Sequence, residues 1–142
     1  MAGDEETPKG MRIAGRLASG LVIAFLVLDG AVKMVPIAPV TETLAALGYP
    51  SDAAMARLLG LLTLAATVLY AVPRTACLGA IVLTGYLGGA MATHLRVGSP
   101  AFSHTLFGLY LGVMIWGGLW LRDARLHALL PIRRPTSSGG SG

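Results

Sequence analysis

The sequence predicts an all-α membrane protein, a four-helix transmembrane bundle whose helices run up, down, up and down. Of its 142 residues, 54% are apolar and only 13% are charged, about half the charged share of a soluble domain, which is roughly 25%. The apolar residues gather in four long stretches, and the last three are joined by loops of a few residues, which force neighbouring helices to be antiparallel. This composition argues against a disordered chain and against a soluble domain.

Each expected span is an apolar stretch of about 20 residues, the length that crosses a bilayer. The four spans are residues 13–35, 53–72, 76–95 and 101–121. The third is the cleanest, since it has no charged residue between Ala76 and Thr93. Residues 1–12 then form a polar N-terminal tail and residues 132–142 a flexible, Gly- and Ser-rich C-terminal tail, which leaves 13–131 as the membrane domain.

Residues beside the spans suggest where the helices start and stop. Ser51 and Ser99 are the expected N-caps of the second and fourth spans. Pro73 follows the second span and cannot continue its helix. Residues 40–47 predict a short helix at the membrane surface, and Gly48 suits a left-handed C-cap behind it.

Basic residues are divided unequally between the two sides of the expected bundle. The side with both termini carries eight: Lys9, Arg12, Arg16, Arg74, Arg122, Arg125, Arg133 and Arg134. The other side carries three: Lys33, Arg57 and Arg96. Because basic residues are retained in the cytoplasm, this imbalance predicts cytoplasmic termini, in what we expect to be a bacterial plasma membrane. The net charge of +4 is thus explained by topology, and we expect no nucleic acid partner.

Ionisable residues from all four spans are expected at one depth, toward the outer side. Five of them are the candidate ligand-binding residues: Asp29, Lys33, His94, Arg96 and His104. Ionisable groups within spans usually mark a pathway or a binding site. Two interpretations of Asp29 stay open, because Lys33 lies one turn away. The carboxylate either forms a structural ion pair with Lys33 or belongs to a site shared with another helix.

Metal binding and catalysis are not expected of this chain alone. His94, His104 and Asp29 offer ligand types that suit a metal, but a histidine pair more often makes hydrogen bonds between helices. The catalytic residue is unknown, and we expect no intrinsic cofactor. The single cysteine, Cys77, excludes an internal disulfide.

Glycines at a spacing of four predict close helix packing on the third and fourth spans. The candidate packing residues are Gly85, Gly88, Gly89, Gly108 and Gly112. They either pack these two spans against each other or form a homo-oligomer interface.

Several short motifs resemble the landmarks of the DoxX-like family of membrane proteins, over roughly residues 13–131. The motifs are Asp29–Lys33, Leu47–Pro50, Pro73–Ala80, Leu83–Ala90, Ala92–Arg96 and Trp120–Asp123. The resemblance implies a four-helix integral membrane protein, and most family members have no assigned activity. The wider superfamily includes a subunit associated with thiosulfate:quinone oxidoreduction and members linked to oxidative stress or thiol homeostasis. Relatives often carry a Glu in the second span, where this chain has Thr63.

These observations favour an accessory or binding subunit that holds a small anionic or quinone-like molecule in an outward-facing polar pocket. The setting would be a redox or stress-related membrane system, in which a membrane redox partner supplies any quinone chemistry. A small proton-coupled transporter and a structural or assembly factor for another membrane protein are the alternatives.

Overall fold

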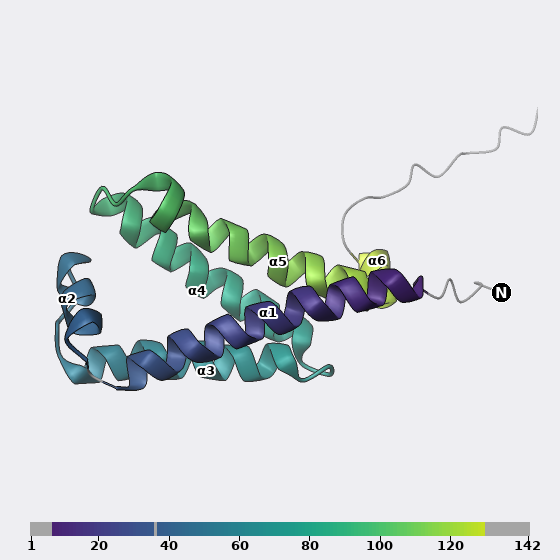
Figure 1. The fold of residues 1–142 in the computed structure, drawn as a ribbon, viewed down its shortest axis with the longest axis horizontal. Coiled ribbons are helices and arrows are strands. Elements are labelled where there is room, and N and C mark those ends of the chain that lie inside the picture. The colour runs from purple at the N-terminus through teal and green to yellow at the C-terminus, as the bar shows by residue number, and fades with distance from the viewer. Residues whose placement is uncertain (1–6, 36, 130–142) are drawn as a thin grey trace, which may run out of the picture.

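The computed structural model describes residues 7–35 and 37–129, and over these ranges the chain is helical and contains no strand. Its elements are α1 (Lys9–Met34), α2 (Ala38–Ala46), α3 (Ala53–Ala71), α4 (Ala76–Arg96), the π-helix η1 (Ala101–Thr105), α5 (Leu106–Arg122) and α6 (Ala124–Leu129). Helices α1, α3, α4 and the continuous η1–α5 segment are each long and apolar enough to cross a membrane. Figure 1 shows them alternating in direction, which confirms the predicted four-helix bundle.

The expected boundaries hold to within a few residues. Helix α1 begins at Lys9, so residues 9–12 are helical and do not belong to a polar tail. The short helix between the first two spans is present as α2, and Gly48 behind it has the expected positive φ of 78°. The expected C-terminal tail, residues 132–142, lies outside the described residues.

Both predicted N-caps are wrong. The N-cap of α3 is Asp52, whose carboxylate accepts a hydrogen bond of 2.7 Å from the Met55 amide. The fourth span begins with η1, and its N-cap is Pro100. Ser99 has a different partner, because its hydroxyl lies 3.0 Å from Nδ1 of His94.

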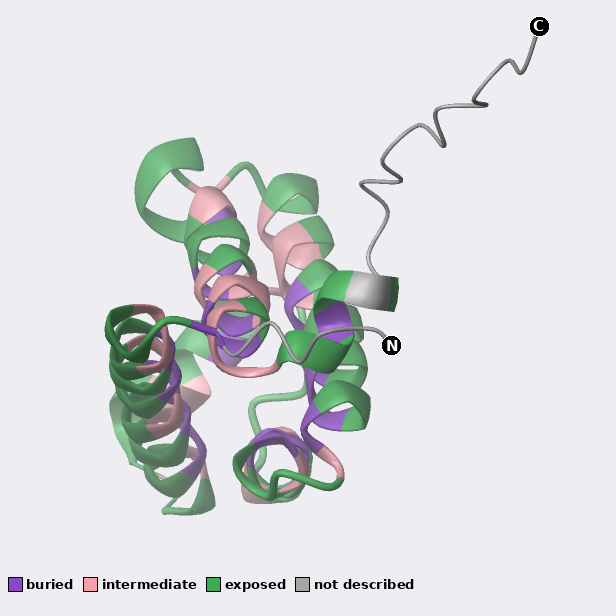
Figure 2. Ribbon diagram, turned by 90° about the vertical axis from the view of Figure 1, so that its right-hand side faces the viewer, coloured by how far each residue is buried: buried purple, intermediate pink, exposed green. Residues whose placement is uncertain are grey.

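Helix α1 packs against both α3 and α5, while α4 packs against the same two helices from the opposite side. We call the end where α1 and α4 finish the α2 end, and the end where α1 begins and α5 finishes the terminal end. Figure 2 shows that buried residues face the interior and exposed residues cover the outside. Many exposed residues are large and apolar, such as Leu21 and Leu61, as expected for helices surrounded by lipid.

Small residues let α1 approach its two partners at opposite ends. At the terminal end, a Cβ on Gly15 would lie 2.8 Å from the carbonyl oxygen of Gly118 on α5. At the α2 end, a Cβ on Gly60 of α3 would lie 2.8 Å from the carbonyl oxygen of Gly30. Helix α1 therefore crosses the bundle, from α5 at its start to α3 at its finish (Figure 1).

The core of the terminal end is centred on Tyr70, which is fully buried. Its hydroxyl donates a 2.8 Å hydrogen bond to the carbonyl oxygen of Ile115 on α5 and lies 2.9 Å from the hydroxyl of Ser19 on α1. The guanidinium of Arg122 stacks over its ring at 5.2 Å. One side chain of α3 thus joins three helices, and its polar atom is satisfied where no water is available.

Of the two alternatives for the glycines, packing of the third and fourth spans against each other is wrong for four of the five residues. A Cβ on Gly85, Gly88, Gly89 or Gly112 would meet nothing within 4 Å. Gly108 alone of the five lies at a helix contact, where a Cβ would be 2.7 Å from Cγ of Met91. The spacing of four does place Gly85 and Gly89 on one face of α4, but no other described part of the chain packs closely against the two glycines. No observation tests a homo-oligomer interface there.

We expect Gly79→Ala to destabilise the protein, because a Cβ at Gly79 would lie 2.2 Å from the backbone nitrogen of Tyr70. Backbone cannot move aside cheaply, so the cost should be about 1–3 kcal/mol, as for other overpacking changes. Thermal unfolding in detergent measures it. The matched control is Gly88→Ala on the same helix, which has open space and should not lower the melting temperature. Equal melting temperatures for the two variants would contradict the assigned α3–α4 contact.

Candidate functional site

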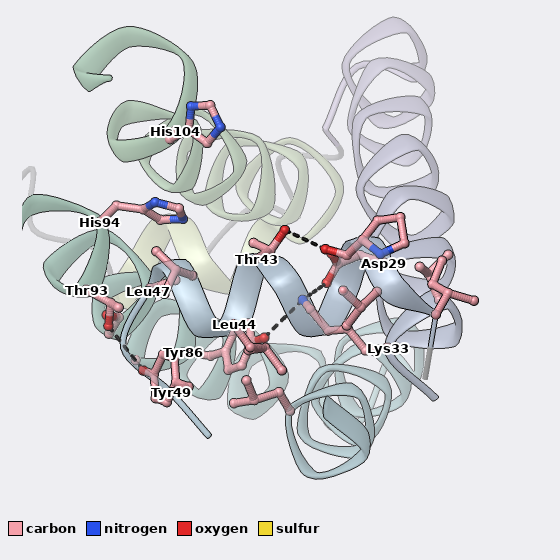
Figure 3. A pocket seen from close by; sticks show the side chains of 18 residues that line it. Asp29, Lys33, Thr43, Leu44, Leu47, Tyr49, Tyr86, Thr93, His94 and His104 are labelled. Carbon is pink, nitrogen blue, oxygen red and sulfur yellow. Dashed lines mark hydrogen bonds and ion pairs between the residues drawn. The ribbon is translucent and has the colours of Figure 1, made fainter. Parts of the chain in front are cut away.

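A cavity of about 630 Å³ lies at the α2 end, between α1 and α4 and beneath α2 (Figure 3). Its walls are largely apolar and include Val32, Val40, Leu44 and Leu59. Its polar lining residues are Asp29, Lys33, Thr43, Tyr49, Tyr86, Thr93, His94 and His104. A largely apolar pocket with a few convergent polar groups is the usual form of a small-molecule site.

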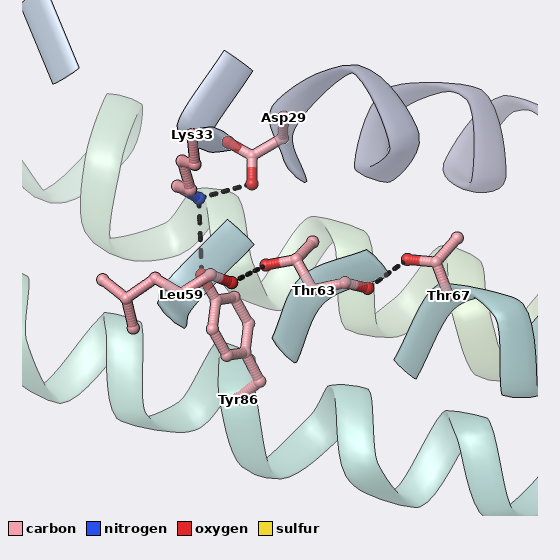
Figure 4. A network of polar contacts seen from close by, with 6 residues as sticks. All are labelled: Asp29, Lys33, Leu59, Thr63, Thr67 and Tyr86. Carbon is pink, nitrogen blue, oxygen red and sulfur yellow. Dashed lines mark hydrogen bonds and ion pairs between the residues drawn. The ribbon is translucent and has the colours of Figure 1, made fainter. Parts of the chain in front are cut away.

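Lys33 connects the two sides of the cavity. Its ammonium group is ion-paired with Asp29, one turn earlier on α1, and donates a 3.3 Å hydrogen bond to the hydroxyl of Tyr86 on α4 (Figure 4). The side chains of Lys33 and Asp29 are 22% and 32% exposed, so the pair is largely shielded. The partner of Asp29 is therefore Lys33, and the link to another helix runs through Tyr86.

Thr63 supplies no acid at the position where the family resemblance implies a glutamate. Its side chain is fully buried, and its hydroxyl donates a 2.9 Å hydrogen bond to the carbonyl oxygen of Leu59 in its own helix (Figure 4). Thr67 bonds in the same way to the carbonyl oxygen of Thr63. Among the residues that line the cavity, Asp29 alone carries a carboxylate, and Lys33 neutralises it.

Two histidines face the cavity from α4 and η1 (Figure 3). Nδ1 of His94 lies 3.0 Å from the hydroxyl of Ser99, and Nδ1 of His104 lies 2.7 Å from the hydroxyl of Ser103. The ring centroids are 5.6 Å apart. Because each Nδ1 is held by a serine, Nε2 is the ring nitrogen left to bind a ligand.

Among the described residues, no third metal ligand lies beside the two histidines. In the part of the chain that the structure describes, no three His, Cys, Asp or Glu side chains group closely enough to hold a metal ion. Asp29, the third ligand considered from the sequence, is ion-paired with Lys33.

Arg96 does not line the cavity and instead anchors α2. Its guanidinium donates a 2.8 Å hydrogen bond to the carbonyl oxygen of Leu47, at the end of α2. A second tie joins the hydroxyl groups of Tyr49 and Thr93, which are 3.1 Å apart. The structure therefore groups four of the five candidate residues around the cavity and corrects the role of Arg96.

Sequence reasoning missed the cavity face of α4. Gly85, Tyr86, Gly89, Thr93 and His94 all line the cavity, and their spacing of one, four, eight and nine residues is that of one helix face. The sequence contains this pattern, but Gly85 and Gly89 are also four residues apart, which is the spacing of a helix-packing motif. Their missing side chains instead widen the cavity, because nothing lies within 4 Å of either Cβ position.

Charge in the cavity is nearly balanced. Of the three basic residues expected on this side, only Lys33 lines the cavity, and Asp29 pairs with it. A ligand therefore meets hydrogen-bonding groups on apolar walls, and no unpaired cation faces it among the lining residues.

The model of the DoxX-like family matches residues 17–118, which include most of α1, all of α2, α3, α4 and η1, and most of α5. No curated protein and no solved structure matches the chain.

We expect Asp29→Asn to destabilise the protein more than the double variant Asp29→Asn with Lys33→Met. The single change leaves a shielded ammonium without its counter-charge, at a cost of about 1–3 kcal/mol, whereas the double change removes both charges. Thermal unfolding in detergent compares them. Asp52→Asn is the matched control, because Asn caps a helix as well as Asp does. A double variant as unstable as the single one would show that the unpaired Lys33 ammonium is not the cause of the instability.

Proposed function

Because the chain belongs to the DoxX-like family of integral membrane proteins, we propose that it is a membrane-embedded binding subunit whose cavity holds the head group of a quinone-like molecule. The observation that carries the proposal is the cavity itself, with apolar walls and hydrogen-bonding groups on opposite sides.

The distribution of polar groups supports a flat head group with an oxygen at each side. Lys33 and Tyr86 offer N–H and O–H donors at one end of the cavity. At the other end, His94 and His104 offer ring nitrogens whose orientation the neighbouring serines hold. Quinone carbonyls accept hydrogen bonds, and the quinone ring can pack against the apolar wall. The volume of about 630 Å³ is within the range of small-molecule sites, roughly 300–1,000 Å³.

Charge balance favours a quinone-like ligand over a small inorganic anion. An anion would need an unpaired cation in so apolar a setting, because burying an uncompensated charge is costly. The ammonium of Lys33 already has its counter-ion in Asp29. Electron transfer would depend on a membrane redox partner, and the role of this chain would be to hold and orient the ligand.

Binding of a water-soluble benzoquinone without a tail tests this proposal, by calorimetry on detergent-purified protein. We expect saturable binding that Tyr86→Phe weakens about three- to tenfold, the worth of one hydrogen bond. The matched control is Tyr110→Phe, which removes the same hydroxyl from an exposed tyrosine outside the cavity. Absence of binding, or equal affinity of wild type and Tyr86→Phe, contradicts the proposal. Tight binding of thiosulfate in its place would favour the anionic alternative.

We also propose that both termini face the cytoplasm of a bacterial plasma membrane, which puts the cavity in the outer half of the bilayer. The imbalance of eight basic residues against three supports this orientation.

Cysteine labelling on intact cells tests the orientation. On a Cys77→Ser background, Ser51→Cys should react with a membrane-impermeant thiol reagent. Arg74→Cys should react only after the cells are opened. Both residues are exposed in loops at opposite ends of the bundle. The reverse pattern would place the cavity on the cytoplasmic side.

A further inference from the structure

Helix α2 lies across the end of the bundle (Figure 1), and its residues line the cavity there. Leu44 of α2 is only 5% exposed. The end of α2 is tied to α4 twice, through the Arg96 bond to the Leu47 carbonyl and through the Tyr49–Thr93 contact. Entry along the bundle axis would require these contacts to break.

The side of the cavity between α1 and η1 is built differently. Phe25 of α1 meets Phe107 of α5 edge to face, with ring centroids 5.2 Å apart. Asp29 and Val32 follow Phe25 on the same face of α1, since they are four and seven residues further on. Asp29 and Val32 line the cavity and do not extend the contact between α1 and α5. His104 of η1 also lines the cavity.

The two walls of this side are held by different contacts. Gly30 holds α1 against Gly60 of α3 at this end. Helix η1 in turn packs against α4 and α5. Val32 and His104 line the cavity on this side, and Phe25 and Phe107 lie next to it and contact each other. We call the space between α1 and η1 beside these four residues the lateral opening.

The edge of the lateral opening is apolar and exposed. Phe25, Val32 and Phe107 are 39%, 38% and 40% exposed, although each belongs to a membrane-spanning helix. In a bilayer, such surface faces acyl chains. A head group in the cavity is therefore separated from the lipid only by the lateral opening. The apolar residues beside this opening suit a hydrocarbon chain.

From this geometry, and resting on the proposed quinone-like ligand, we infer that the ligand is a lipid-dissolved molecule with an apolar tail. Its head group enters sideways between α1 and η1, and its tail remains in the lateral opening. The ligand class is thus a long-chain amphiphile drawn from the membrane, in contrast to a metabolite taken from water.

Photolabelling in nanodiscs tests this inference. The probe is a benzoquinone with a decyl chain that carries a diazirine, and mass spectrometry locates the adducts. We expect adducts on residues 25–32 and 102–107. Excess tail-less benzoquinone should reduce their yield about fivefold or more, because it competes with the probe for one head-group site. A decyl diazirine without the quinone should label lipid-facing residues such as Leu21 without such competition.

A pair of tryptophan variants tests the route. Val32→Trp narrows the lateral opening, so it should lower the competed adduct yield about fivefold or more. Leu28→Trp adds the same bulk one turn away on α1, at a residue that is 64% exposed and outside the cavity, and should change little.

The outcomes separate the two proposals. Competed adducts that lie on α2 would overturn the sideways entry and leave the quinone-like ligand standing. Equal effects of the two tryptophans would also overturn the assigned route. Adducts that tail-less benzoquinone never suppresses would overturn the binding site itself, and the inference with it.

Discussion

The structure depends on how closely α1 approaches two different helices. Gly15 brings its first half against Gly118 of α5, and Gly30 brings its second half against Gly60 of α3. In lipid, where burial of apolar surface gives no net drive, such backbone proximity supplies the packing energy. A single straight helix can satisfy both contacts only by crossing the bundle obliquely. The bundle is consequently tight around Tyr70 at one end and open at the other, and the cavity occupies the open end.

Most polar groups of the cavity are already paired within the protein. Asp29 and Lys33 satisfy each other, and the hydroxyl of Thr63 is occupied by its own helix. A base or a nucleophile needs a free and perturbed group beside the substrate. The groups left to a ligand are the remaining N–H of Lys33, the Tyr86 hydroxyl and the outer ring nitrogens of the two histidines. A binding subunit that relies on another protein for electrons is consistent with this set.

Much of the fold and part of the site could be predicted from the sequence. Four apolar stretches with short loops leave few arrangements, and the topology alone puts Asp29, Lys33, His94 and His104 at one depth. Which face of α4 turns inward could not be predicted, because Gly85 and Gly89 fit a helix contact and a cavity wall equally well. Arg96 was misassigned for a related reason, since its long side chain reaches back to α2 from beyond the cavity. Such choices depend on neighbouring helices, which local sequence does not specify.

The turns that end α2 and α4 also position two residues of the cavity wall. Gly48 and Gly98, with φ of 78° and 69°, reverse the chain after α2 and α4. In each case the next residue closes the motif by donating its amide to a carbonyl five residues earlier, Tyr49 to Leu44 and Ser99 to His94. The side chains of those same residues then hold Thr93 and His94 in the cavity wall. The orientation of the His94 ring therefore depends on the left-handed backbone conformation of Gly98, which does not line the cavity. The geometry of the cavity wall thus depends partly on two turns whose glycines do not line it.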